Sequence, residues 1–303
     1  MATPGEPPGN PGPGFDPTTQ PACVRHPDRP TGLTCVRCEE PSCPECLREA
    51  SVGYQCVDCV NEGAAASRVA ARQSGGRAVI GAGADRPLVV PLLIGLNVGI
   101  FALTVLEARS VMGNSQAGLF EMWSLRPLAV AQGDWWRLFT TGFLHFGPIH
   151  LAFNMWALWV IGRDIEVMLG RARFLLLYLV SLLGGAAASF MFSQVQAETA
   201  GASGAVFGLL AAAGVLLHRI GRSPRPAIML LSINIALSLL IPGVSLSGHL
   251  GGLVVGAIAA AILVYAPRGR ERAVQLGGIA ALVAVLIVLM VVRVQMLNVF
   301  LTS

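Results

Sequence analysis

The strongest constraint on this chain is its series of long, predominantly apolar segments. Each is about 16 to 25 residues long, close to or above the length that crosses a hydrocarbon core about 30 Å thick. They cover residues 88–107, 150–169, 174–194, 202–218, 227–242, 248–266 and 275–299. With 54% hydrophobic and 13% charged residues among 303, the chain is too apolar for a soluble protein of this size. The sequence therefore predicts an all-α, polytopic membrane helix bundle.

Composition divides the rest of the chain into further regions. Residues 1–21, rich in proline and glycine, are predicted to be disordered. Residues 22–60 hold all seven cysteines, and residues 61–86 form an Ala/Gly/Arg tether, flexible or partly helical. The membrane core is expected over residues 87–270, with an additional span in residues 271–303. No basic segment followed by an apolar one opens the chain, so no cleavable signal peptide is expected.

Arginines predict the orientation of the bundle, since all 21 basic residues are arginine. With the N-terminus inside, thirteen arginines near the spans lie on the inner side, and only Arg109, Arg126 and Arg137 lie on the outer side. Positive residues concentrate in cytoplasmic loops. We therefore expect a multi-pass protein of the cell membrane with a cytoplasmic N-terminus.

Four polar residues stand at the outer ends of predicted spans. Ser203 lies at the outer end of the fourth span, His249 at that of the sixth, and His150 and Asn154 at that of the second. Each alone is explained by capping or interhelical hydrogen bonding. Polar residues gathered at one depth on three spans point instead to a functional site.

Small residues on two of these spans explain how the polar groups could meet. Gly204, Gly208 and Ala212 recur every four residues after Ser203, and Gly248, Gly252 and Gly256 do so around His249. Such strips let membrane helices approach closely, although they are common packing devices in any bundle. If the two strips face each other, Ser203 and His249 lie side by side.

The chemistry of these groups predicts a serine hydrolase. Ser203 would be the nucleophile and His249 the general base. His150, the Asn154 amide and the backbone N–H of Ser203 can stabilise an oxyanion. The absence of lysine excludes a Ser-Lys dyad, and no carboxylate lies near His249 in the sequence, so a dyad is expected rather than a triad.

These motifs resemble those of the rhomboid family of intramembrane serine proteases. The resemblance covers about residues 88–270 and rests on "GASG" with Ser203, "HLAFN" with His150 and Asn154, "GHLGGLVVG" with His249, and the Trp136-Arg137 pair. It implies a six-helix core, a water-filled active site open to the outer face, and transmembrane proteins as substrates. It also implies that Gly201 belongs to the oxyanion loop. Phe207 stands where many members place the tyrosine that stacks on the catalytic histidine, and residues 275–299 match the variant with a seventh helix.

The cysteine region predicts two structural zinc ions. Seven cysteines suit disulfides poorly, but with one histidine they supply eight ligands. The ligands are Cys23, His26, Cys35, Cys38, Cys43, Cys46, Cys56 and Cys59. Their order resembles a B-box-type zinc finger, which implies that alternate pairs share an ion, while sequential pairing stays open. We expect no metal in catalysis. Binding of a cytoplasmic protein partner is one expected role of this module.

The sequence thus favours an intramembrane serine endopeptidase that acts on transmembrane proteins within the lipid bilayer. The alternative is a rhomboid-like pseudoprotease that binds membrane clients without cutting them, although such relatives typically lack the serine or the histidine. A transporter or channel is a weaker third reading, because the spans carry few charges at mid-depth. No nucleic-acid partner is expected.

Overall fold

The structure is a computed structural model that describes residues 20–50, 52–73, 86–240 and 244–302. The chain divides into two units, Met1–Gly75 and Gly76–Ser303. Apart from residues 20 and 21, the tail predicted to be disordered lies outside the described residues, as does the tether between residues 74 and 85. The described part of the tether, up to Gln73, is helical.

The N-terminal unit is built from two small antiparallel sheets and one helix. Strands β1 (Ala22–Cys23) and β2 (His26–Pro30) form the first sheet, and β3 (Leu47–Glu49) and β4 (Tyr54–Cys56) form the second. The one-turn 3-10 helix η2 (Pro44–Cys46) precedes β3, and α1 (Val57–Gln73) follows β4. Among the described residues of this unit, the buried hydrophobic side chains are six cysteines and Leu47. The cysteines therefore take the place of an apolar core.

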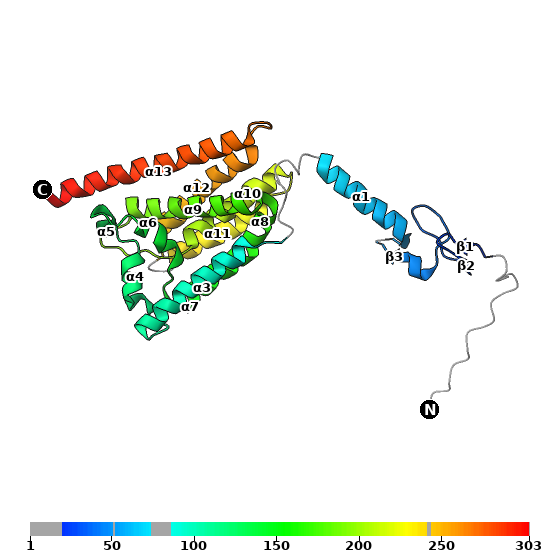
Figure 1. Ribbon diagram of the computed structural model, residues 1–303, viewed down its shortest axis with the longest axis horizontal. Helices are drawn as coiled ribbons and strands as arrows, with labels where there is room; N and C mark the ends of the chain where they lie inside the picture. The colour runs from blue at the N-terminus through cyan, green and yellow to red at the C-terminus, as the bar shows by residue number, and fades with distance from the viewer. Residues whose placement is uncertain (1–19, 51, 74–85, 241–243, 303) are drawn as a thin grey trace, which may run out of the picture. The chain divides into compact units, whose positions relative to one another are not determined.

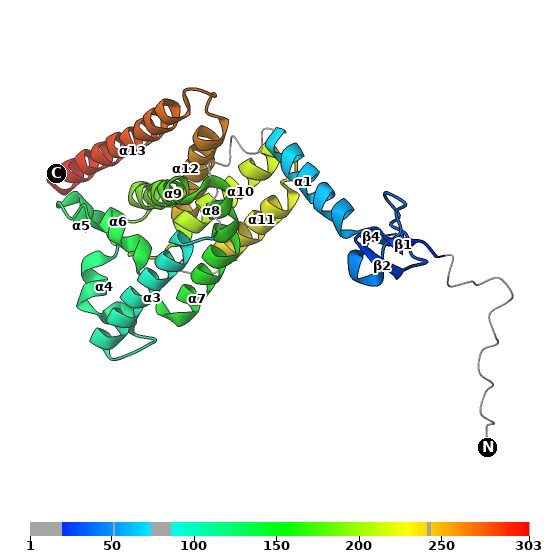
Figure 2. The same cartoon turned by 45° about the vertical axis from the view of Figure 1, so that its right-hand side comes forward.

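The second unit is a helix bundle whose main helices lie at all seven positions predicted for spans (Figures 1 and 2). Helix α3 (Val89–Ala108) comes first, and the second predicted span is a continuous run of α7, a π-helical turn η5 and α8. The bounds of these and the later helices are α7 Gly147–Ala157, η5 Leu158–Gly162, α8 Arg163–Leu169, α9 Arg171–Phe192, α10 Ser203–Arg219, α11 Arg225–Leu240, α12 Leu246–Tyr265 and α13 Glu271–Thr302.

Not all of these helices are long enough to cross a membrane unaided. Within the described residues, α3, α9, α12 and α13 satisfy both length and apolarity. A fifth candidate is a pair of helical segments, Arg137–Phe143 and Gly147–Leu169, that meet at an angle of 90°. Helices α10 and α11 are shorter, with 17 and 16 residues. At 1.5 Å per residue, α10 is about 25 Å long, which is shorter than a hydrocarbon core of about 30 Å.

The segment between α3 and α7 folds into short helices instead of extended loop. These are η3 (Asn114–Gln116), α4 (Gly118–Trp123), α5 (Pro127–Ala131), α6 (Arg137–Thr140) and η4 (Thr141–Phe143). Trp135, Trp136 and Phe139 remain exposed on it, as expected for an interfacial element.

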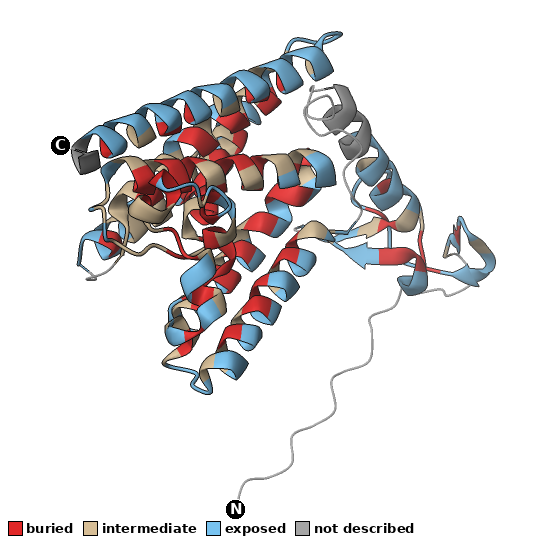
Figure 3. Cartoon of the chain, turned by 60° about the vertical axis from the view of Figure 1, so that its left-hand side comes forward, coloured by how far each residue is buried: buried red, intermediate tan, exposed pale blue. Residues whose placement is uncertain are grey.

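Helices α9, α10 and α12 form the centre of the bundle, with α13 on one side and α3 and α7 on the other (Figure 1). The most apolar part of α9 is 67% buried, against 22% for α13. Figure 3 shows the same contrast, with buried residues concentrated in the central helices and exposed ones along α13. The polar end of this central trio is where the candidate site lies.

Candidate active site and metal centre

Glycines bring α10 and α12 into backbone contact. A Cβ at Gly252 would collide with the carbonyl of Gly204, and a Cβ at Gly256 would collide with Gly208. The two strips of small residues therefore face each other, as their four-residue spacing predicts. On the neighbouring helix α9, a Cβ at Gly185 would lie 2.8 Å from the carbonyl oxygen of Gly248. Only residues without side chains allow the three helices to approach this closely.

Ser203 is the first residue of α10, and a fixed loop leads into it. Gly201 has a φ of +139°, which an L side chain rarely adopts. Its N–H donates to the carbonyl of Thr141 (3.0 Å), while the Thr141 hydroxyl donates to the carbonyl of Thr199 (2.6 Å). Leu125 and Thr199 exchange two backbone hydrogen bonds of 2.9 Å. The loop is thus held by the segment between α3 and α7.

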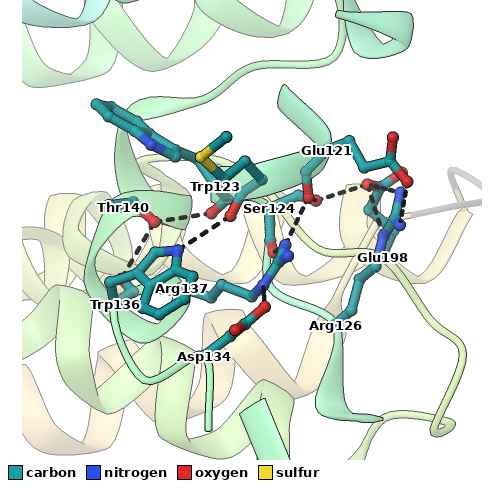
Figure 4. A network of polar contacts seen from close by, with 10 residues as sticks. Glu121, Trp123, Ser124, Arg126, Asp134, Trp136, Arg137, Thr140 and Glu198 are labelled. Atoms are coloured by element: carbon teal, nitrogen blue, oxygen red, sulfur yellow. Dashed lines mark hydrogen bonds and ion pairs between the residues drawn. The ribbon is translucent and has the colours of Figure 1, made fainter. Parts of the chain in front are cut away.

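A polar network strengthens the same attachment (Figure 4). Glu198, two residues before Ala200, accepts hydrogen bonds from the Ser124 hydroxyl (2.6 Å) and from the Arg126 guanidinium (2.8 Å). Arg137 is 8% exposed, donates to the carbonyls of Glu121 and Ser124, and pairs with Asp134 at 2.8 Å. The Trp136-Arg137 pair therefore fixes the short helices against which the loop rests.

His249 lies in the first turn of α12 and is 8% exposed. Its imidazole stacks on Phe207 of α10, with ring centroids 4.1 Å apart and 15° between the planes. Its Nδ1 lies 2.7 Å from the hydroxyl oxygen of Ser238 on α11. Ser245 caps α12 by accepting the N–H of Gly248 (3.2 Å), which fixes the start of the helix that carries the ring.

All five predicted catalytic residues line one cavity of about 870 Å³, together with Phe207 and Ser238; the five are His150, Asn154, Gly201, Ser203 and His249. Among the described residues, no hydrogen bond joins Ser203 directly to His249. Catalytic hydrogen bonds are often long without substrate and shorten when it binds. The cavity is therefore a place where a peptide bond, the hydroxyl and the imidazole could meet.

His150 is placed to donate a hydrogen bond into this cavity. The backbone N–H of Phe146 donates to its Nδ1 (3.3 Å), so in the neutral ring Nε2 carries the hydrogen. A Cβ at Gly201 would lie 3.0 Å from this Nε2 and 3.5 Å from Oγ of Ser203. The N–H therefore lies beside Gly201, the residue two positions before Ser203.

Asn154 lies one turn after His150 on α7 and is 7% exposed. Its amide nitrogen donates to the carbonyl of His150 (2.9 Å), which identifies the amide orientation because a carbonyl accepts only. The second hydrogen of that amide is available to the cavity.

Glu166, a carboxylate on α8, takes no part in this cavity. It accepts the backbone N–H groups of Leu88, Val89 and Val90, at the start of α3, at 2.7 to 2.9 Å.

The structure groups the eight predicted metal ligands into two alternate sets. These are Cys23, His26, Cys43 and Cys46, and Cys35, Cys38, Cys56 and Cys59, with all ligand atoms of each set within 4.8 Å of one another. Zinc–sulfur bonds of about 2.3 Å at tetrahedral angles place neighbouring ligand atoms about 3.6 to 3.8 Å apart. Nδ1 of His26 lies 3.3 to 3.9 Å from the sulfurs of its set, and Sγ of Cys38 lies 3.8 Å from Sγ of Cys56. Both sets fit a tetrahedral zinc ion.

The thiols of these sets differ in how readily they lose a proton. Hydrogen bonds from the backbone, foremost at Cys43, lower the pKa of the Cys23 thiol to about 6. Burial raises the pKa of Cys46 to about 11. Because zinc binds thiolates, a bound ion would hold the cysteine ligands deprotonated. Its positive charge would compensate the negative thiolates that burial disfavours.

Two supporting residues are not evident from the sequence. Ser238 lies on a separate helix, eleven residues before His249, and Thr141 begins the short helix η4, 62 residues before Ser203. Neither stands in a motif. The only signal for Ser238 is a hydroxyl in an otherwise apolar helix, where back-bonding to the preceding turn is the ordinary explanation.

Known proteins with similar sequences match the same region. The family model described as the rhomboid domain matches residues 132–266. Rhomboid protease GluP of Bacillus subtilis is 39% identical over 186 residues, which cover 59% of this chain and 35% of GluP. YdcA of the same bacterium, also named as a rhomboid, is 36% identical over 137 residues, or 43% of this chain and 67% of YdcA. Rhomboid protease AarA of Providencia stuartii is 31% identical over 163 residues, or 45% of this chain and 58% of AarA. The chain thus spans about a third of GluP's length.

Proposed function

Because this chain belongs to the rhomboid family, we propose that it is an intramembrane serine endopeptidase with Ser203 as nucleophile and His249 as general base. The observation that carries the proposal is a cavity that Ser203 and His249 line together. The two residues stand on α10 and α12, which touch through their glycines. Relatives named as rhomboid proteases support the same activity.

In the proposed reaction, Oγ of Ser203 attacks the carbonyl carbon of the scissile bond while its proton passes to Nε2 of His249. The carbonyl oxygen becomes an oxyanion. The C–N bond then breaks as His249 gives that proton to the departing amine, which leaves an ester on Ser203. A water molecule, deprotonated by His249, attacks the ester and restores the serine, and both halves of the substrate have then been released.

Three groups are placed to stabilise the oxyanion. Nε2–H of His150 lies beside Gly201. Within the part of the chain that the structure describes, one hydrogen of the Asn154 amide and the backbone N–H of Ser203, at the start of α10, have no acceptor. The positive end of the α10 dipole adds to their effect. Removal of one such donor typically slows a serine protease about 100- to 1,000-fold.

The proposed substrates are transmembrane proteins cut in or near their membrane segments. A stable helix hides its carbonyls, so a substrate must expose extended backbone within the cavity. Segments with glycine or proline near the outer boundary should therefore be preferred. The arginine distribution supports a cytoplasmic N-terminus and a site that opens to the extracytoplasmic side.

For the N-terminal unit we propose a B-box-type module with two structural zinc ions. The alternate grouping of the ligands and their tetrahedral spacing support it. Since all eight ligands are protein side chains, neither ion has an open position for catalysis. We propose that the surface of this module binds a cytoplasmic protein partner.

The proposal is tested by reconstituting the protein with a model transmembrane substrate. Cleavage should be lost in Ser203→Ala and in His249→Ala, and it should persist in Ser232→Ala, which removes an exposed hydroxyl from α11. A fluorophosphonate should label Ser203 in the unsubstituted protein and not in His249→Ala. Cleavage that survives in Ser203→Ala would remove the proposed mechanism, and binding without cleavage in the unsubstituted protein would favour a pseudoprotease.

A further inference from the structure

The second ring nitrogen of His249 has a partner that a Ser-His dyad does not require. Nδ1 of His249 lies 2.7 Å from Oγ of Ser238, which belongs to a different helix, α11. Both side chains are buried, with 7% of Ser238 and 8% of His249 exposed. A hydrogen bond this short between buried groups constrains where the imidazole carries its proton.

The direction of this hydrogen bond follows from a second contact of the same hydroxyl. Oγ of Ser238 also lies 2.7 Å from the backbone carbonyl oxygen of Asn234, one turn earlier on α11. A hydroxyl has one hydrogen and a carbonyl only accepts, so that hydrogen points at Asn234. If it pointed at His249 instead, two oxygens would face each other at 2.7 Å with no hydrogen between them. Ser238 therefore accepts a hydrogen bond from Nδ1–H of His249.

The consequence concerns the reactive nitrogen. A neutral imidazole carries one hydrogen, and with that hydrogen on Nδ1 the lone pair is on Nε2. Nε2 is then able to accept the proton of Ser203. We propose, on the basis of the serine protease mechanism above, that Ser238 is a positioning residue that holds His249 in this tautomer. In a Ser-His-Asp triad the buried carboxylate performs the same task.

A hydroxyl suits this position better than a carboxylate would. A buried carboxylate needs several hydrogen bonds or a charge partner, and no arginine is among the described residues that line the cavity with His249. Together with Phe207, Ser238 fixes the ring completely: the stack on α10 sets its plane, and the contact with α11 sets its rotation within that plane.

The two histidines of the cavity are thereby held in opposite tautomers. Nδ1 of His150 accepts the N–H of Phe146, which leaves its Nε2–H as a donor. Nδ1 of His249 donates to Ser238, which leaves its Nε2 as an acceptor. The two histidines thus have different proposed roles, His150 as an oxyanion donor and His249 as a base. The contact that each makes through Nδ1 decides which role its Nε2 can take.

A spectroscopic experiment tests the tautomer without any substrate. Nitrogen-15 NMR of histidine-labelled protein distinguishes protonated from unprotonated ring nitrogens, and His249→Gln identifies the signals of His249. We expect a protonated Nδ1 and an unprotonated Nε2 in the unsubstituted protein, and a shift toward the opposite tautomer in Ser238→Ala. A protonated Nε2 in the unsubstituted protein would overturn the proposal.

A kinetic experiment tests its consequence. Ser238→Ala should lower kcat about tenfold to a hundredfold with little change in KM, because the Nδ1–H of His249 would be left buried without its acceptor, which costs more than the net loss of a hydrogen bond. Ser238→Thr, which keeps the hydroxyl and its bond to the preceding turn, should restore most of the rate. Ser232→Ala is the matched control, since its hydroxyl also bonds one turn back but is exposed. Equal rates for Ser238→Ala and the unsubstituted enzyme would contradict the proposal.

These results are separable from a failure of the proposed function. If the protein cuts no substrate, or if Ser203→Ala still cuts, the protease assignment fails while the NMR tautomer of His249 is still measured. If Ser238→Ala does not fold, the tautomer of the unsubstituted protein and the rate of Ser238→Thr still decide the question. An inactive but folded Ser238→Thr would count against the hydroxyl as the functional group.

Discussion

Phe207 stacks face to face on the imidazole of His249, with ring centroids 4.1 Å apart and 15° between the planes. Phe207 lies one turn after Ser203 on α10, so a single helix carries the proposed nucleophile and supports the ring of the proposed base. The distance between Ser203 and the imidazole is therefore set by the local geometry of one helical turn and by the contact of α10 with α12.

This relationship predicts the effect of removing the aromatic ring. Phe207→Leu keeps an apolar side chain but loses the stack, which is worth about 0.5–1.5 kcal/mol. We expect kcat/KM to fall about two- to tenfold, with Phe207→Tyr close to the unsubstituted rate. The measurement is cleavage of a reconstituted transmembrane substrate. Full activity in Phe207→Leu would show that the stack does not orient the base.

The glycine contact predicts a position-specific sensitivity to a single methyl group. Gly252→Ala would drive a Cβ into the carbonyl of Gly204, so α10 and α12 must separate. We expect a loss of about 1–3 kcal/mol in the free energy of unfolding and a severe loss of cleavage.

The matched control is Gly214→Ala on α10, where an added Cβ meets nothing within 4 Å. Alanine favours the helix over glycine, so this variant should be at least as stable as the original and equally active. Both quantities are measured by denaturant titration in detergent micelles and by substrate cleavage. If Gly252→Ala behaved like Gly214→Ala, close packing of the two helices would not be what aligns the site.

The loop before Ser203 predicts a role for Thr141. Thr141→Val has nearly the same shape but cannot donate to the carbonyl of Thr199. Loss of one such hydrogen bond is worth about 0.5–1.5 kcal/mol, so we expect kcat to fall about two- to tenfold. Fluorophosphonate labelling of Ser203 should slow in parallel. Thr104→Ser, which keeps the hydroxyl bond to the carbonyl of Phe101 within α3, is expected to have no effect.

The N-terminal unit predicts two independent metal sites. The protein should bind two zinc ions per chain, and Cys35→Ser should lower this toward one by disrupting only the second set. Chelation should expose residues 20–73 to protease, because cysteines form nearly all of the buried hydrophobic residues described there. Elemental analysis and limited proteolysis measure the two effects. Loss of both ions from Cys35→Ser would indicate a single cooperative unit in place of two independent sites.

Much of the architecture follows directly from the sequence. Runs of apolar residues gave helices at all seven predicted positions, because a membrane span needs a minimum length of apolar helix. Gly204 and Gly208 face Gly252 and Gly256, which is the condition under which the sequence predicts that Ser203 and His249 lie side by side. The predicted segments 202–218 and 227–242 have the same lengths as α10 and α11. The 90° break before Gly147 was not predicted, since apolar composition does not set a bend.

The supporting residues of the site were beyond sequence analysis for a different reason. Thr141, Glu198 and Ser238 act through contacts between segments that are distant in sequence, and their residue types are common in loops and helices. The pairing of the metal ligands was equally open, because eight ligands in four pairs permit more than one arrangement. Only the fold of the two small sheets brings alternate pairs together.

Helix α11 holds the imidazole of His249 through Ser238, but little of the helix is buried against the rest of the bundle. Of its 16 residues only Ala227 and Ser238 are buried, while its apolar side chains, among them Ile228, Ile233 and Leu239, are exposed to the surroundings. A lateral displacement of α11 by an ångström or two is enough to break a contact of 2.7 Å. A change of bilayer thickness or an arriving substrate helix that displaces α11 would therefore alter the hydrogen bond at Nδ1 of His249 without touching His249 itself.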